Sequence, residues 1–131
     1  MIKCIYQLYL KKILFKNKNI LFEKESIIDK RCLFGGYNSI GTRTIFLSSE
    51  IGEGSYISSD CRLNKIKIGK FCSIGQNVKN SIGRHPSKTF VSTHPAFFSN
   101  QKQAGFSFVD KTTFKEHLYI DKEKLFHCSI G

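Results

Sequence analysis

The stretch IGEGSYISSDCRLNKIKIGKFCSIGQNV, residues 51–78, carries an apolar residue at about every sixth position. This spacing fits neither the helical period of 3.6 nor the strand period of 2. A constant period of this kind indicates that one small structural unit is used several times in succession. With a slip of one residue after the third member, the repeated residues are Ile51, Ile57, Leu63, Ile68 and Ile74.

The same pattern extends toward the N-terminus and has further regular members. A glycine follows the apolar residue in most repeats, and a small or β-branched residue lies four places after it. The earlier apolar members are Ile28, Phe34, Ile40 and Phe46. The glycines are Gly35, Gly41, Gly52, Gly69 and Gly75. The small or β-branched residues are Thr44, Ser55, Cys61, Cys72 and Val78.

Short strands explain this repeat better than a helix. Each interior glycine would cost a helix about 1 kcal/mol relative to alanine. On a strand, side chains two residues apart share a face, so the small residue and the next apolar residue both point inward. Glycine then provides backbone freedom at the corner between strands. Three strands make one coil of about 18 residues, and stacked coils pair at the sheet spacing. The repeat therefore predicts a parallel β-helix.

The N-terminal segment has a different period. Apolar residues between positions 2 and 16 recur at spacings of three and four, with lysines largely off that stripe. This pattern predicts a short amphipathic helix that packs on the end of the main domain. The alternative is peripheral contact of residues 2–16 with an anionic membrane surface, because lysines and aromatic residues flank the apolar stripe.

Composition limits the remaining possibilities. The 131 residues, 40% of them hydrophobic, suffice for one ordinary domain. A net charge of +11 favours anionic partners in general, but no nucleic-acid recognition motif is visible, and we expect no nucleic-acid partner. No apolar run approaches the length of a membrane span, and no signal peptide is visible, which predicts cytoplasmic localisation. The five cysteines are widely spaced and predict reduced thiols, with Cys61 and Cys72 in the core.

A second motif follows the repeats. Residues 82–98 read IGRHPSKTFVSTHPAFF. The hexapeptides resemble those of left-handed β-helix acyltransferases, and this motif is similar to the loop of the xenobiotic (chloramphenicol and streptogramin) acetyltransferase branch and its polysaccharide-modifying relatives. The resemblance covers residues 28–131. It implies an all-β, left-handed parallel β-helix with a loop excursion, and a homotrimer with active sites between its subunits.

The resemblance also implies a reaction. His85 occupies the position of the general base, which takes a proton from a hydroxyl of the acceptor as that oxygen attacks acetyl-CoA; no acyl-enzyme forms. Backbone N–H groups stabilise the oxyanion. His94 is the second candidate for the base. The acceptor that the resemblance implies is a cell-surface sugar or, as second choice, an antibiotic. The residues expected at the acceptor site are Arg84, Ser92, Thr93, His94, Phe97 and Phe98.

No residue is assigned to the coenzyme, and no metal is expected. His85 and His94 are nine residues apart, and His117 and His127 are ten apart, which does not match the spacing of a metal site. The expected division is 1–22 for the helix and connector, 23–83 for the coils, and 84–131 for the acceptor loop, a charged arm at 111–124 and the start of another coil.

The last three residues, 129–131, look like the opening of a further hexapeptide. In the resembling family more coils follow this point and carry much of the contact with acetyl-CoA. We therefore expect the chain to be a C-terminally truncated form of such an enzyme. Two alternatives to an active O-acetyltransferase remain open. One is a non-catalytic remnant, and the other is a basic β-solenoid module that binds an acidic glycan or a membrane surface.

Overall fold

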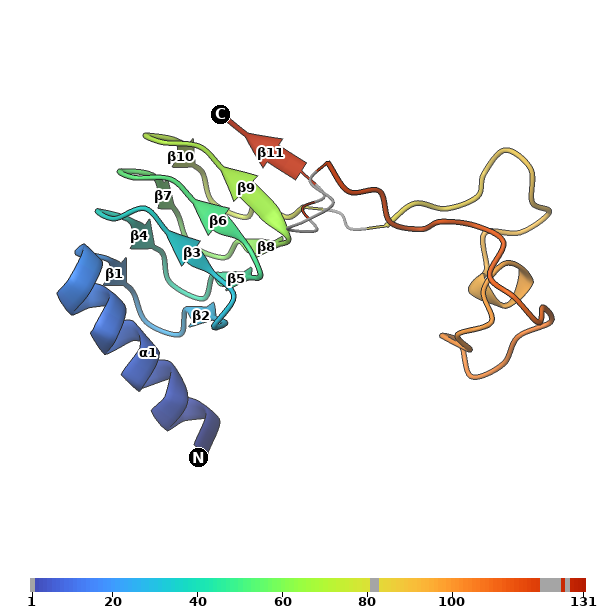
Figure 1. Cartoon of the computed structure of the whole chain (residues 1–131), viewed down its shortest axis with the longest axis horizontal. Coiled ribbons are helices and arrows are strands. Elements are labelled where there is room, and N and C mark those ends of the chain that lie inside the picture. The colour runs from blue at the N-terminus through green and yellow to red at the C-terminus, as the bar shows by residue number, and fades with distance from the viewer. Residues whose placement is uncertain (1, 81–82, 121–125, 127) are drawn as a thin grey trace. The chain divides into compact units, whose positions relative to one another are not determined.

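The protein is a parallel β-solenoid of about three turns with one N-terminal helix, which confirms the expected β-helix (Figure 1). The computed structural model describes residues 2–80, 83–120, 126 and 128–131, and describes side chains from residue 5 onward. Helix α1 spans Ile2–Lys18, and a short 3-10 helix, η1, spans Pro95–Phe97. The strands are β1 (Leu21–Phe22), β2 (Ile27–Ile28), β3 (Leu33–Phe34), β4 (Ser39–Ile40), β5 (Ile45–Leu47), β6 (Glu50–Ile51), β7 (Tyr56–Ile57), β8 (Arg62–Asn64), β9 (Ile66–Ile68), β10 (Ser73–Ile74) and β11 (Cys128–Ile130).

The strands form three parallel sheets along the solenoid. Their orders are β1-β4-β7-β10, β2-β5-β8 and β11-β9-β6-β3. Leu21 pairs with Ser39, and Ser39 pairs with Tyr56, so one coil takes 18 residues and the next takes 17. The coil length agrees with the value expected from three hexapeptides.

The repeated apolar residues fill the interior of the coils. All of the nine from Ile28 to Ile74 are buried, none more than 6% exposed. Of the small or β-branched residues of the repeat, Thr44, Ser55 and Cys61 are buried, and Cys72 and Val78 are partly buried. Polar groups of the buried residues link neighbouring coils. Thr44 Oγ1 donates to the carbonyl of Ser58 at 2.7 Å and accepts from the N–H of Cys61 at 3.2 Å. These hydrogen bonds satisfy polar groups that burial would otherwise leave unpaired.

The glycines have a different role from the one expected. They follow the inward apolar residues but lack positive φ, whereas the left-handed corners are held largely by other residues such as Tyr37 (φ 53°) and Asp60 (φ 61°). A Cβ on Gly52 would lie 2.5 Å from the carbonyl oxygen of Gly69 in the next coil. At Gly52 the absence of a side chain therefore permits close approach of the stacked backbones. Because none of the five repeat glycines has positive φ, the expectation of backbone freedom at these positions was wrong.

The chain leaves the solenoid and later returns to it. Residues 1–81 and 119–131 form one compact unit, the coil unit, and residues 82–118 form a second, the loop unit. On return, β11 pairs with β9, with Cys128 opposite Ile66. The loop unit is thus an insertion between consecutive coil strands. The coils also begin before residue 23, because β1 already pairs with β4. Residues 121–124 of the expected charged arm lie outside the described residues.

Helix α1 lies against the first coil, as expected (Figure 1). Leu10 and Leu14 pack against the core of the coil unit. Among the helices that the structure describes, none is long and apolar enough to cross a membrane.

Candidate functional site

The loop unit is organised around aromatic side chains. The rings of Phe90, Phe98 and Phe114 meet edge to face, with centroids 5.6 to 6.2 Å apart. Phe98 is fully buried in this cluster. Such edge-to-face contacts stabilise a small unit beyond the apolar area that they bury. The segment between residues 90 and 114 therefore closes on itself.

His85 lies on a stretch without helix or strand at the start of the loop unit and is exposed. The buried Pro86 follows it and biases this stretch away from helical geometry. The N–H of Ser87 donates to the carbonyl of His85 at 2.9 Å, and the N–H of Arg84 donates to the carbonyl of Glu116 at 2.9 Å. Both bonds hold the backbone on either side of the imidazole. Among the described residues, the imidazole itself has no hydrogen-bond partner.

The His85 side chain borders a surface hollow of about 500 Å³. The hollow combines an imidazole, two hydroxyls, two cationic groups and an aromatic ring. In the described part of the chain, no carboxylate lines it. The lining residues are Arg84, His85, Pro86, Ser87, Lys88, Thr89 and Phe114.

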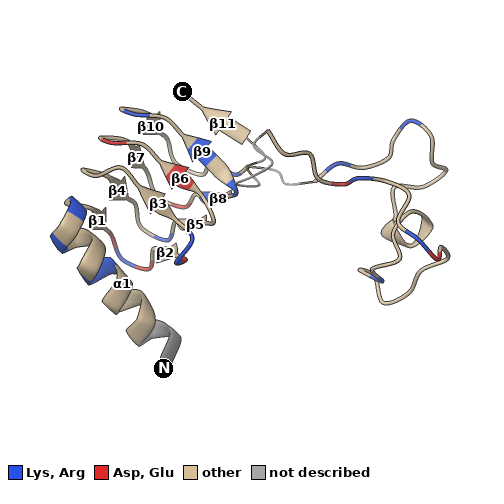
Figure 2. Ribbon diagram, viewed as in Figure 1, with Lys and Arg blue, Asp and Glu red and all other residues tan. Residues whose placement is uncertain are grey.

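One of the two cationic side chains at this hollow is held by an aromatic ring. The Arg84 guanidinium lies over the Phe114 ring, 5.4 Å from its centroid, in a cation–π arrangement. Lys88 provides a second, exposed positive charge. Lysines and arginines are otherwise spread over helix, coils and loop unit (Figure 2). Positive side chains occur throughout this chain. What distinguishes the hollow is that two of them lie beside a histidine.

His94 has a different environment. Its Nδ1 accepts the N–H of Ala96 at 3.2 Å and so caps η1. Its ring stacks on Phe106 at 5.7 Å between centroids and meets Phe97 edge-on at 6.3 Å. The Ser92 hydroxyl accepts the N–H of His94 at 3.1 Å. His94, Ser92 and Phe97 thus form a second cluster.

The structure divides the expected site residues into three groups. Arg84 and His85 share the hollow, His94 belongs to the cap of η1, and Phe98 is buried behind the Phe114 ring at 5.6 Å. Thr93 is exposed on the segment before His94. Sequence reasoning had left out Ser87, Lys88, Thr89 and Phe114. Ser87, Lys88 and Thr89 belong to the motif of residues 82–98. Phe114 lies outside this motif, in a segment without repeats.

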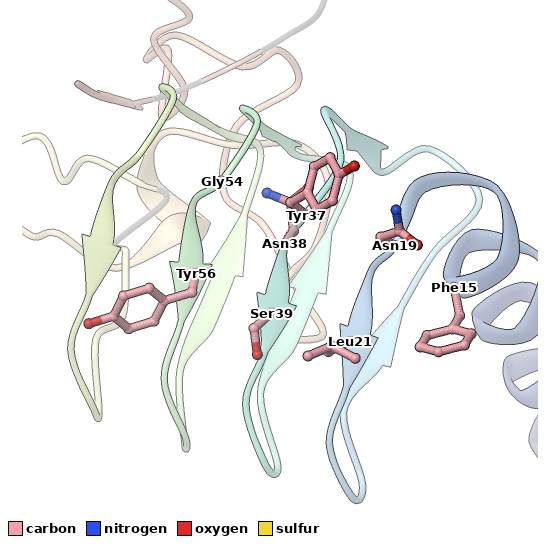
Figure 3. A pocket seen from close by; sticks show the side chains of 8 residues that line it. All are labelled: Phe15, Asn19, Leu21, Tyr37, Asn38, Ser39, Gly54 and Tyr56. Carbon is pink, nitrogen blue, oxygen red and sulfur yellow. The ribbon is translucent and has the colours of Figure 1, made fainter.

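A second hollow, of about 520 Å³, lies on the coil unit. Figure 3 shows Tyr56 at one end and Phe15 at the other, with Ser39 and Leu21 between them. The outward residues of β1, β4 and β7, which are Leu21, Ser39 and Tyr56, contribute to it. It offers aromatic and hydroxyl contacts, and no histidine or carboxylate of the described ranges lines it. The residues around it are Phe15, Asn19, Leu21, Tyr37, Asn38, Ser39, Gly54 and Tyr56.

Among the residues that the structure describes, the thiols and the potential metal ligands form no further site. Burial, together with the nearby Asp29 carboxylate, raises the pKa of the Cys32 thiol to about 12. Cys61 is buried, and its Sγ donates to the carbonyl of Gly75 at 3.1 Å, while Cys72 is half-buried. Within the described residues, no three His, Cys, Asp or Glu side chains are placed to hold a metal ion. His127 lies outside these residues.

No family model, no curated protein and no solved structure matches this chain.

Proposed function

We propose that this chain is an O-acetyltransferase of the hexapeptide-repeat type. It moves the acetyl group of acetyl-CoA to a hydroxyl of a sugar or a related small molecule. The observation that carries the proposal is the exposed His85 imidazole at a hollow lined by cations and hydroxyls, in a loop unit inserted into a β-solenoid. The motif of residues 82–98 supports the choice of reaction by resemblance.

The base is His85, because its imidazole is available. With Nδ1 of His94 occupied as an acceptor, the neutral ring of His94 carries its proton on Nε2 and presents a donor there. A donor cannot take the proton of an attacking hydroxyl. The place of the His85 imidazole supports this assignment, because it borders open space where an acceptor can sit.

The reaction is a direct transfer. A nitrogen of the neutral His85 imidazole takes the proton of the acceptor hydroxyl as its oxygen forms a bond to the thioester carbon. The tetrahedral intermediate collapses, the C–S bond breaks, and the coenzyme A thiolate takes the proton from the imidazolium. The products are the acetyl ester and coenzyme A, and His85 returns to its neutral form.

The other lining residues fit binding roles. The hydroxyls of Ser87 and Thr89 suit the hydroxyls of a sugar, and the Phe114 ring offers an apolar surface to its ring. Arg84 and Lys88 suit an anionic group, either on an acidic sugar or on coenzyme A. The proposal also includes a homotrimer, which rests on the resemblance alone and which sedimentation of the purified chain tests.

Acetyl-CoA labelled in its acetyl group, incubated with the full chain and a panel of hydroxyl compounds, tests the reaction. The panel includes neutral hexoses, uronic acids and chloramphenicol. We expect a labelled, alkali-labile ester with at least one sugar. Absence of ester with every acceptor, while circular dichroism reports a folded β protein, would overturn the proposal and favour the non-catalytic alternatives.

A further inference from the structure

Helix α1 faces the coils with polar side chains. Gln7 exchanges two hydrogen bonds with the backbone of Ile28, donating to its carbonyl at 2.6 Å and accepting its N–H at 3.2 Å. Lys11 Nζ donates to the carbonyl and the hydroxyl of Ser26, and Lys18 Nζ donates to the carbonyl of Phe34 at 2.7 Å. Gln7, Lys11 and Lys18 lie on one side of the helix because they are spaced by four and seven residues.

Most of the large apolar side chains of α1 are exposed. A helix on a globular domain normally buries its large apolar residues and exposes its polar ones. Here only Leu10 and Leu14 pack against the core, and the other large apolar side chains that the structure describes in α1 are exposed. They are Ile5 (63%), Tyr6 (45%), Leu8 (64%), Tyr9 (63%), Ile13 (39%) and Phe15 (55%).

The charged residues of α1 are all positive. Its sequence, IKCIYQLYLKKILFKNK, contains five lysines and no acidic residue. The positions of Ile5, Tyr9, Lys12 and Lys16 are separated in turn by four, three and four residues, so all four share the outward side. Both lysines are exposed. The outward side therefore combines apolar and aromatic residues with lysines that have long, flexible stems.

We propose that the outward side of α1 binds the surface of an anionic phospholipid bilayer. The helix lies in the interface plane, with the aliphatic and aromatic side chains among the acyl chains and the ammonium groups of Lys12 and Lys16 at the lipid phosphates. Interfacial helices of this kind gain affinity from buried apolar area and from attraction to anionic headgroups. Gln7, Lys11 and Lys18 hold the helix on the coils, so the coil unit comes to the membrane with it.

The charges favour a lipid surface over a second copy of the chain. If two α1 helices pair in parallel, Lys12 and Lys16 face their own counterparts. If they pair antiparallel, the same lysines face Ile5 and Tyr9. Both arrangements bury ammonium groups without an anion, which costs free energy, since the helix has no carboxylate to offer. Lipid phosphates and phosphatidylserine carboxylates supply the missing negative charge.

Flotation of the full chain with vesicles tests the apolar part of the proposal. We expect the chain to float with vesicles of phosphatidylcholine mixed with phosphatidylserine. The variant Leu8→Ser removes a leucine that is 64% exposed on α1, and Leu33→Ser removes one that is 51% exposed on β3. We expect Leu8→Ser to weaken partitioning about tenfold and Leu33→Ser to leave it unchanged. Equal partitioning of both variants contradicts the proposal, as does a parent chain that forms dimers through α1 and does not float.

A second pair of matched variants tests the role of charge in the proposal. Lys12→Gln/Lys16→Gln removes two positive charges from the outward side of α1, and Lys24→Gln/Lys30→Gln removes two exposed ones from the coils. At about 1 kcal/mol for each lysine near an anionic surface, we expect the first pair to weaken partitioning about thirtyfold. We expect a much smaller effect from the second pair, and loss of binding for the parent chain on pure phosphatidylcholine at high salt. Equal effects of the two pairs contradict the proposal, because they would indicate attraction of net charge alone.

Discussion

His94 Nδ1 accepts a hydrogen bond from the backbone N–H of Ala96 at 3.2 Å. This bond holds the first turn of η1 and fixes the tautomer of the neutral ring, with the proton on Nε2. His85, nine residues earlier, has an imidazole without a hydrogen-bond partner in the described part of the chain. The two histidines of one motif therefore differ in what they can do, and the proposed mechanism depends on that difference.

The tautomer of His94 can be measured directly. Long-range ¹H–¹⁵N spectra of the labelled chain, recorded at a pH at which the rings are neutral, distinguish a protonated Nε2 from a protonated Nδ1. We expect the Nε2–H form for His94 because Nδ1 must accept from Ala96. The variant Ser92→Ala removes a neighbouring contact without touching Nδ1 and is expected to keep the same tautomer. A predominant Nδ1–H form in the parent chain would contradict the assigned cap.

Two glycines of the repeat should respond differently to alanine. A Cβ on Gly52 meets the carbonyl oxygen of Gly69 at 2.5 Å, whereas a Cβ on Gly75 has no neighbour within 4 Å. We expect Gly52→Ala to lower the free energy of unfolding by about 2 kcal/mol or more, because coil stacking must relax. Gly75→Ala should change it by less than about 0.5 kcal/mol. Urea unfolding followed by circular dichroism measures both. Similar losses for both variants would indicate that backbone freedom, rather than close approach, selects these glycines.

The hydroxyl of Ser55 links two coils. It is fully buried, donates to the carbonyl of Gly69 at 2.7 Å and accepts the N–H of Cys72 at 2.8 Å. Ser55→Ala leaves both backbone groups buried without this partner, and we expect a loss of about 2 kcal/mol in unfolding free energy. Ser73→Ala, at an exposed position of β10, is the control and should be close to neutral. An equally small effect of Ser55→Ala would argue against this hydrogen-bond ladder.

Cys32 should be unreactive although it is only half-buried. Burial and the neighbouring Asp29 raise the pKa of its thiol from 9.0 to about 12. At mildly alkaline pH the raised pKa lowers the thiolate fraction about a thousandfold, and the thiolate is the form that iodoacetamide alkylates. Iodoacetamide labelling, mapped by mass spectrometry, should modify Cys32 slowly in the native chain and rapidly in urea. Native labelling at the rate found in urea would contradict the raised pKa.

The sequence predicts the solenoid well because its determinants are local and periodic. Each inward residue, such as Ile57 or Leu63, repeats at a spacing that fits a coil of three short strands and neither the helical nor the simple strand period. The role of Gly52 was missed because the close approach of Gly69 depends on the distance between stacked coils, which no single repeat contains. The sequence also predicts that a further coil starts near residue 129, but not that Cys128 lies opposite Ile66, since the loop unit separates the two strands in sequence.

The site was predictable only in part. His85 and Arg84 stand in a motif, and the structure brings them to one hollow. Phe98, expected at the acceptor wall, is fully buried against Phe114. An aromatic residue in a loop can line a cavity, or it can be buried beneath a residue that lines the cavity. Which of the two occurs depends on the residue against which it packs. That partner, Phe114, comes from a segment whose charge had suggested an arm outside the coil.

The rate of coenzyme A release from acetyl-CoA, measured with the acceptor that gives the labelled ester, tests the central claim most directly. His85→Gln removes the base, and His117→Gln changes a histidine outside the hollow. A general base contributes about 10² to 10⁴ in rate, so we predict that His85→Gln lowers kcat/KM at least about a hundredfold. We predict that the kcat/KM of His117→Gln stays within about twofold of that of the parent chain, because His117 does not line the hollow. Equal rates for the parent chain and a folded His85→Gln variant would contradict the account.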